Sequence, residues 1–235
     1  AVFGGGSPAG TITLAADMTV GDMTLSGGDF RFLPKAAGVG LTGARLSQTA
    51  GNNAILLPLD MDTLSVSGGR LTLGPAIVSN TLTLSGGGLD LAGTAAVARL
   101  ISSNSPTLRF LPGASLSLAG PSSLTGLVDI DLFRDKTLAA ISLGAGASLS
   151  LNQAGLLLRH TGLTNDSGSW LLVSGPYSGA FSSTQIGTAT LTGTLRYDTA
   201  GGKVLFDGQY VVADDNLPGL FTLSLLKLNQ VVPTA

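Results

Sequence analysis

The chain has 235 residues, of which 44% are apolar and only 11% are charged, less than half the share of about 25% in an ordinary soluble domain. All 14 acidic residues are Asp, cysteine is absent, and the formal net charge is −2. These values exclude disulfides and thiolate metal sites, and without clustered Lys or Arg we expect no binding of nucleic acid. With 34 Gly and no Glu, the composition predicts a turn-rich all-β protein, because Glu normally covers the exposed faces of helices. No run of 18 apolar residues occurs, so no transmembrane helix is expected.

The first segment, residues 1–22, includes "AVFGGGSPAGTITLAA", which carries no charged side chain. Exposed sheet edges usually carry charge as a defence against pairing with other chains. We therefore predict that residues 1–22 form an N-terminal cap or assembly segment, with Val2 and Phe3 as self-association residues. The segment also reads as a mature terminus left after signal cleavage, so we expect a secreted protein.

Residues 23–160 contain a repeat. The chain reads "TLSVSGGRLTLG" from residue 63 and "TLTLSGGGLDLAG" from residue 81, and the first Leu of each copy belongs to a series at steps of 18: Leu46, Leu64, Leu82 and Leu100. A further copy, "MTLSGGDFRFLP", begins at Met23, with about five additional residues before the next copy. Beyond Leu100 the spacing predicts that the series continues through Leu118, Leu138 and Leu156.

Within each copy, apolar and polar residues alternate on both sides of a pair or triplet of Gly. The alternation predicts strands with one buried face, and the Gly residues predict a corner between them. A single copy has nothing to bury its apolar face against, whereas stacked copies bury it at the strand spacing of about 4.8 Å. We therefore predict a β-solenoid with coils of about 18 residues. A β-sandwich is the alternative, although it has no reason to keep an 18-residue register.

The remaining residues depart from this register. Residues 161–212 contain longer apolar runs, more aromatic residues and the hairpin-like "YDTAGGKV", which predict irregular β coils that form an atypical C-terminal cap. Residues 213–235 follow the turn-like "DDNLPG" and predict a tail strand. Its alternating Phe221, Leu223 and Leu225 are predicted to take part in self-association, since only Lys227 adds charge to this run.

Few residues offer chemistry. His160 is the only histidine and there is no Glu to partner it, so we interpret it as structural or exposed, with no catalytic residue and no cofactor expected. The densest charged stretch is "DIDLFRDK", in which Asp129 and Asp131 fall on one strand face and are weak candidates for calcium ligands. The more common form of such a stretch is an exposed loop with offsetting charges. Asp214 and Asp215 are similarly weak calcium candidates within a turn.

The sequences "NTLTLSGGGLDLAG" and "SWLLVSGPYSGAFSS…GTLRYDTAGGKVLFDG" resemble those of bacterial autotransporter passenger domains and of secreted Gly/Ser/Thr-rich repeat proteins. The resemblance covers roughly residues 11–212 and lies in composition and style more than in a specific motif. It implies a right-handed β-helix that is displayed on, or released from, a bacterial surface.

These observations together predict a secreted structural protein of the bacterial cell surface, a self-associating subunit of a filament, surface layer or adhesin scaffold. Its expected partners are other copies of itself and cell-surface components. The alternative is a polysaccharide-binding or polysaccharide-degrading module on the same β-helix. An enzyme should gather carboxylates and Arg in one groove, whereas a scaffold should scatter them.

Overall fold

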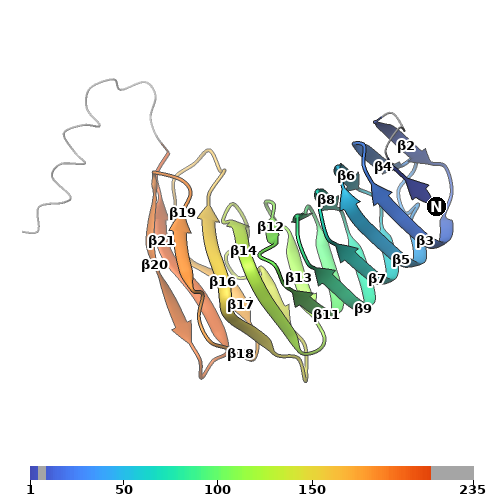
Figure 1. The fold of residues 1–235 in the computed structure, drawn as a ribbon. Helices are drawn as coiled ribbons and strands as arrows, with labels where there is room; N and C mark the ends of the chain where they lie inside the picture. Colours follow the sequence, from blue (N-terminus) through green and yellow to red (C-terminus); the bar gives the residue numbers. More distant parts are fainter. Residues whose placement is uncertain (5–8, 213–235) are drawn as a thin grey trace, which may run out of the picture.

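The computed structural model describes residues 1–4 and 9–212, and the regular elements in this part of the chain are all β-strands. The strands stack as the coils of a parallel β-solenoid, which confirms the predicted fold class (Figure 1). Each coil runs around three faces, and each face is a sheet of parallel strands. Within the described residues, no helix has the length and apolarity needed to cross a bilayer.

The three faces share most of the long strands, which turn a corner from one face to the next. Face 1 consists, in stacking order, of β2 (Gly10–Leu14), β4 (Phe30–Pro34), β6 (Asn52–Ile55), β8 (Arg70–Leu73), β10 (Gly88–Leu91), β12 (Thr107–Phe110), the second halves of β14 (Ser122–Asp131) and β16 (Leu149–Arg159), and β19 (Ser183–Ile186). Face 2 consists of the first halves of β3 (Met18–Ser26), β5 (Leu41–Ala50), β7 (Leu59–Val66), β9 (Ala76–Leu84) and β11 (Thr94–Ser102), followed by β13 (Ser115–Leu118), β15 (Ile141–Leu143) and the end of β17 (Asp166–Ser174). Face 3 consists of β1 (Val2–Phe3), the second halves of those five long strands, the first halves of β14 and β16, and β18 (Tyr177–Ser178).

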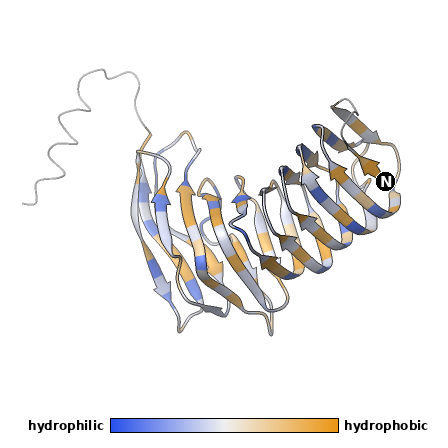
Figure 2. Ribbon diagram, viewed as in Figure 1, coloured by the Kyte–Doolittle hydropathy of each residue, from blue (hydrophilic) through white to orange (hydrophobic). Residues whose placement is uncertain are grey.

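The interior of the solenoid is a set of stacked apolar ladders. On face 3, Leu64 pairs with Leu46 on one side and with Leu82 on the other, and Leu82 pairs with Leu100. All four side chains are at most 1% exposed. Met23 pairs with Leu46 across the longer step that the additional residues require. Figure 2 shows the resulting recurrence of hydrophobic residues along successive strands. Each buried Leu contributes about 1.5–3 kcal/mol relative to an exposed one.

The corner between faces 3 and 1 explains the repeated Gly. Gly69 has φ +66°, a left-handed conformation that side chains with a Cβ rarely adopt, and a Cβ placed there would lie 2.2 Å from the carbonyl oxygen of Gly51 in the preceding coil. Gly87 repeats the arrangement one coil later, with φ +67° and 2.5 Å to the oxygen of Gly69. In these coils the backbone of one corner lies too close to the backbone of the next to leave room for a side chain.

Two buried polar residues interrupt the apolar ladders in the N-terminal coils. Gln48 and Asn53 occupy the positions of Val66 and Leu71 in the next coil, and both are at most 2% exposed. Asn53 donates to the Gln48 side-chain oxygen at 3.0 Å and accepts from the backbone N–H of Phe30 at 2.9 Å. The pair satisfies its own polar groups inside the solenoid, which is the condition for burying them.

The predicted continuation of the 18-residue series beyond Leu100 is wrong. Leu118 pairs with Val97 on face 2, and Leu138 lies outside any strand and is 61% exposed. Leu156 is buried but pairs with Val128 on face 1. The coils lengthen in this region because loops are inserted at the corners, so equal spacing no longer identifies equivalent positions.

The C-terminal end closes with antiparallel strands, as the sequence predicts for an atypical cap. β20 (Leu191–Asp198) and β21 (Lys203–Tyr210) form the hairpin around "YDTAGGKV", and β21 also pairs antiparallel with β17. Trp170 on β17 is fully buried beneath this hairpin, its ring 6.0 Å from that of Phe206. Its indole N–H donates to the carbonyl oxygen of Leu132 at 2.9 Å.

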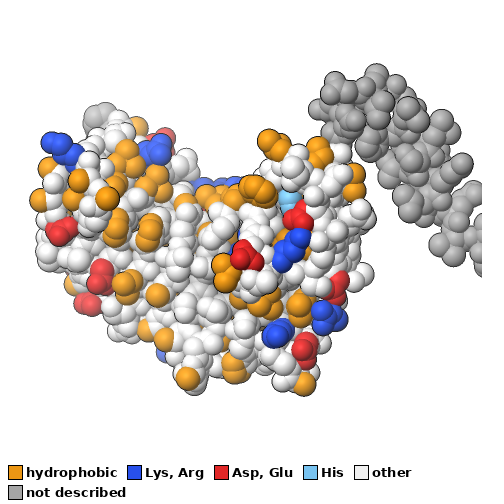
Figure 3. Space-filling model, turned by 180° about the vertical axis from the view of Figure 1, so that it is seen from behind, with side chains coloured by type: hydrophobic (Ala, Val, Ile, Leu, Met, Phe, Trp, Pro, Cys, Tyr) orange, Lys and Arg blue, Asp and Glu red, His pale blue; other side chains and the backbone are white. Residues whose placement is uncertain are grey.

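The predicted segments that fall within the described residues lie along one continuous stack. Residues 1–22 contribute to the first coil, since β3 crosses the boundary between residues 22 and 23 and pairs with β5. The predicted tail strand, residues 213–235, lies outside the described residues. The solenoid bends along its length, with β6, β8 and β12 on the concave side, and Figure 3 shows the surface hollowed there (Figures 1 and 3).

Candidate functional site

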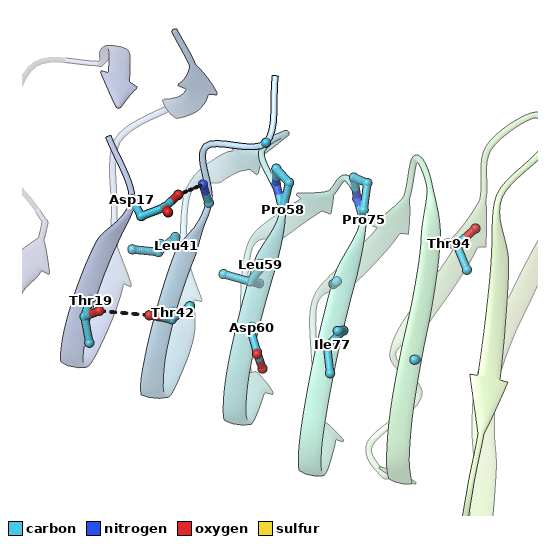
Figure 4. Close-up of a pocket in the computed structure, with 14 residues that line it drawn as sticks. Asp17, Thr19, Leu41, Thr42, Pro58, Leu59, Asp60, Pro75, Ile77 and Thr94 are labelled. Atoms are coloured by element: carbon cyan, nitrogen blue, oxygen red, sulfur yellow. Dashed lines mark hydrogen bonds between the residues drawn. The ribbon is translucent and has the colours of Figure 1, made fainter. Parts of the chain in front are cut away.

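An open groove of about 600 Å³ crosses face 2 of the N-terminal coils (Figure 4). Its floor is the outward row Thr19, Thr42, Asp60 and Ile77, which occupy equivalent positions in four successive coils. Thr19 and Thr42 share a hydrogen bond of 3.0 Å, so part of their polar capacity is used within the protein. The lining is mainly apolar, and its described residues include no His, Cys, Lys or Arg. Such a groove can hold an extended ligand, but it offers few groups for proton transfer.

The N-terminal end of the solenoid holds the predicted self-association residues Val2 and Phe3. Val2 is 76% exposed, whereas Phe3 packs edge-on against Phe30 and Phe32, at ring distances of 5.5 and 5.3 Å. A small apolar hollow of about 80 Å³ opens beside them, and 45%-exposed Met18 lies on its wall. In the described part of the chain, no strand pairs with the outer edge of β2, so its backbone donors and acceptors are free to pair with another chain.

Asp129 and Asp131 lie on β14, as predicted, but they are buried rather than part of an exposed loop, each only 4% exposed. Asp131 accepts from the hydroxyl of Thr161 at 2.8 Å and from the backbone N–H of Phe133 at 3.0 Å. The stretch "DIDLFRDK" thus divides between the end of β14 and the loop after it. On β14, Val128 and Ile130 alternate with the two Asp residues and are fully buried. No group of three or more Asp, Glu, His or Cys is placed to hold a metal among residues 1–4 and 9–212, and Asp214 and Asp215 lie outside the described residues.

Asp129 belongs to an arrangement that the sequence analysis missed. Five successive strands of face 1 carry alternating charges: Arg70 on β8, Asp90 on β10, Arg109 on β12, Asp129 on β14 and Arg159 on β16. Arg70 donates to both oxygens of Asp90, at 2.7 and 2.9 Å, and Asp129 lies between Arg159 at 3.1 Å and Arg109 at 3.5 Å. We call these five residues the charge ladder.

The pKa of Asp129, the fourth residue of the charge ladder, is shifted by its surroundings. Burial raises the pKa of Asp129 above its ordinary value, and the nearby charges of Arg159 and Arg109 offset only part of that effect. The charge ladder could not be recognised from the sequence. Its members are 19 to 30 residues apart and share no single spacing, so only the charge of each residue was visible. These Asp and Arg residues are therefore gathered on face 1, whereas the groove on face 2 is lined, among the described residues, by Asp17 and Asp60 and by no Arg.

His160 is buried at the C-terminal cap. Its ring stacks on Tyr210 at 4.0 Å, and its Nδ1 accepts a hydrogen bond from the Gly162 N–H at 3.1 Å. Nε2 therefore carries the proton and faces a carboxylate oxygen of Asp166 at 3.5 Å. Lys136 also binds Asp166 and lies over the Trp170 ring at 5.0 Å. These contacts fasten the loops after β14 and β16 to the cap, so we interpret His160 as structural.

Asp166 has the opposite electrostatic environment from Asp129. Partial burial would raise the pKa of Asp166, but the hydrogen bonds from Lys136 and His160 and the charge of Lys136 outweigh it, so the pKa lies below its ordinary value. The ionised form of this carboxyl group is thus the one that the folded protein holds.

Comparisons with known proteins add no further assignment. A scan against protein-family models finds no match, and searches of curated proteins and of solved structures return no significant similarity. The resemblance to autotransporter passenger domains therefore rests on the residues quoted for it, while the β-solenoid architecture rests on the structure.

Proposed function

We propose that this protein is a secreted structural protein of a bacterial surface, a self-associating subunit of a filament, surface layer or adhesin scaffold. The observation that supports this most directly is the N-terminal end of the solenoid. There the outer edge of β2 is unpaired among the described residues, next to the apolar hollow that Met18 lines. An edge of this kind binds an added strand through its backbone and selects it by alternating side-chain pockets.

The partner in this proposal is a second copy of the chain. A contact between one end of a subunit and a different surface of the next is heterologous, and its repetition builds an open filament. The tail, with its alternating Phe221, Leu223 and Leu225, is the segment we expect to supply the added strand. A net charge of only −2 leaves little electrostatic repulsion between copies. The proposal includes no catalytic step and no cofactor.

Sedimentation velocity over a range of protein concentrations tests the contact with a matched pair of variants. Met18→Lys places a charge on the apolar end, whereas Ile77→Lys places the same charge at a similarly exposed site (51% against 45%) on the side of the solenoid. We expect the intact chain and Ile77→Lys to assemble and Met18→Lys to remain monomeric. An intact chain that stays monomeric at high concentration, or equal assembly of both variants, would contradict the proposal.

Deletion of residues 219–235 tests the role of the tail. Loss of assembly with an unchanged circular dichroism spectrum would support pairing of the tail with a neighbouring subunit. Retained assembly would mean that the tail instead folds over its own last coil or takes no part.

A further inference from the structure

The charge ladder on face 1 exposes its cations and covers its anions. The side chains of Arg70, Arg109 and Arg159 are 43%, 30% and 41% exposed, whereas those of Asp90 and Asp129 are 9% and 6% exposed. A ladder that served only to neutralise charge between neighbouring strands would not require this asymmetry. What face 1 presents to solvent at this place is a row of three guanidinium groups.

The outer nitrogens of two of these groups are available to a ligand. Arg109 and Arg159 each approach Asp129 through Nε, and in the described residues their terminal amino groups make no hydrogen bond. The carboxylates beneath hold each guanidinium in place, so its remaining donors are oriented before any ligand arrives. An Arg fork of this kind matches a carboxylate or sulfate in geometry as well as charge.

The row also has a regular spacing and a suitable shape. The three Arg lie on every second strand of face 1, and each is two residues further along its strand than the one before, so the row runs obliquely across the strands with backbone positions about 12 Å apart. β8 and β12 lie on the concave side of the bend, and Figure 3 shows Lys or Arg side chains together with hydrophobic side chains along the hollow.

We propose that the concave part of face 1 binds an acidic polysaccharide that crosses the strands obliquely, with uronate carboxylates paired to the free donors of Arg109 and Arg159 and with Arg70 adding positive charge at one end of the row. Leu127, which is half-buried and pairs with Thr107, lies beside the ladder and offers apolar contact to the sugar rings. A glycan is favoured over nucleic acid because the ladder carries only one net positive charge and nucleic acids require several uncompensated cations. The site binds without catalysis and does not depend on self-association.

Isothermal titration of the intact chain with polygalacturonate oligomers, and with a neutral glucan of equal length, tests this proposal. We expect binding of the uronate alone. Arg109→Gln should weaken it at least about tenfold, because it removes a charge-assisted hydrogen bond. Arg45→Gln is the matched control, since Arg45 is exposed and pairs with Asp22 at 3.5 Å on face 3, and it should bind as tightly as the intact chain.

Arg159→Lys provides a second variant that keeps the charge and removes the planar fork. It should weaken binding while the circular dichroism spectrum and the assembly of the protein stay unchanged. No binding of polygalacturonate by the intact chain, equal binding of the neutral glucan, equal losses in Arg45→Gln and Arg109→Gln, or tighter binding of duplex DNA would each overturn the proposal. Because assembly is measured separately, failure here leaves the proposed structural function standing.

Discussion

Replacing Gly69 with Ala perturbs the stacked corner between faces 3 and 1. The backbone there has φ +66°, a region that costs an L-residue roughly 1–2 kcal/mol. The added Cβ would also lie 2.2 Å from the carbonyl oxygen of Gly51, so the backbone of at least one coil must move. That movement disturbs the hydrogen bond of 2.8 Å from the Arg70 N–H to the same oxygen. We expect the two effects together to lower the free energy of unfolding by about 3 kcal/mol or more.

Two further glycines separate the contributions. Gly113 has φ +75° with no atom within 4 Å of an added Cβ, so Gly113→Ala should cost only the conformational strain of roughly 1–2 kcal/mol. Gly21 has neither a positive φ nor a close neighbour. Gly21→Ala should therefore be neutral or stabilise the fold by up to about 1 kcal/mol, through the reduced entropy of the unfolded chain.

Urea unfolding followed by circular dichroism gives the free energies of the three variants, provided that the slope of each transition stays the same. The expected order of stability is Gly21→Ala, Gly113→Ala and then Gly69→Ala. If Gly69→Ala costs no more than Gly113→Ala, the close approach of stacked backbone is not what requires Gly at this corner, and the physical reason given for the repeat is refuted.

Leu82→Ala should lower the free energy of unfolding by about 2–5 kcal/mol, because it opens a cavity in the buried ladder, and urea unfolding measures this directly. Tyr210→Phe removes the 3.0 Å hydrogen bond to the Gly162 carbonyl oxygen, and we expect a loss of about 0.5–1.5 kcal/mol, followed through the fluorescence of Trp170. Folding lowers the pKa of Asp166, so the stability that this carboxyl group contributes is present above its ordinary pKa and is lost as the pH falls. Between pH 7 and pH 3, the melting temperature should therefore fall less in Asp166→Asn than in the intact chain. Folding raises the pKa of Asp129, so the stability contributed by its protonated form is present at low pH and is lost as the pH rises. Asp129→Asn should therefore be at least as stable as the intact chain at pH 7 in the same melting experiment. A large loss of stability in this variant at pH 7 would contradict the prediction.

The architecture could be predicted from sequence where each coil repeats the same pattern. Leu64 and Leu82 lie 18 residues apart and are in register, because the corner between them needs the same few residues in both coils. The prediction failed after Leu100, because residues are added first at the corner between β12 and β13, where Val97 pairs with Leu118, and then in the loop that follows β14. Arg134 holds that loop by donating to the carbonyl oxygens of Ala114, Leu138 and Ala139, contacts that no periodicity could indicate.

The candidate sites were less predictable than the fold. Asp129 and Asp131 could be placed on one strand face by alternation, but their burial depends on Arg109, Arg159 and Thr161, which come from other coils. Parallel strands in register convert distant residues into neighbours, so the charge ladder becomes visible only once the pairing of strands is established. The open end at Val2 and Phe3 could be suspected because its sequence lacks charge, a local property that needs no knowledge of pairing.

The central claim, that this solenoid assembles end to end, is tested most directly by negative-stain electron microscopy of the intact chain at two concentrations, with X-ray diffraction from aligned material. We expect filaments that lengthen with concentration, and a reflection at about 4.8 Å along the filament axis, because coils stacked across the subunit contact continue the strand spacing. Single particles of monomer size at both concentrations would contradict the claim.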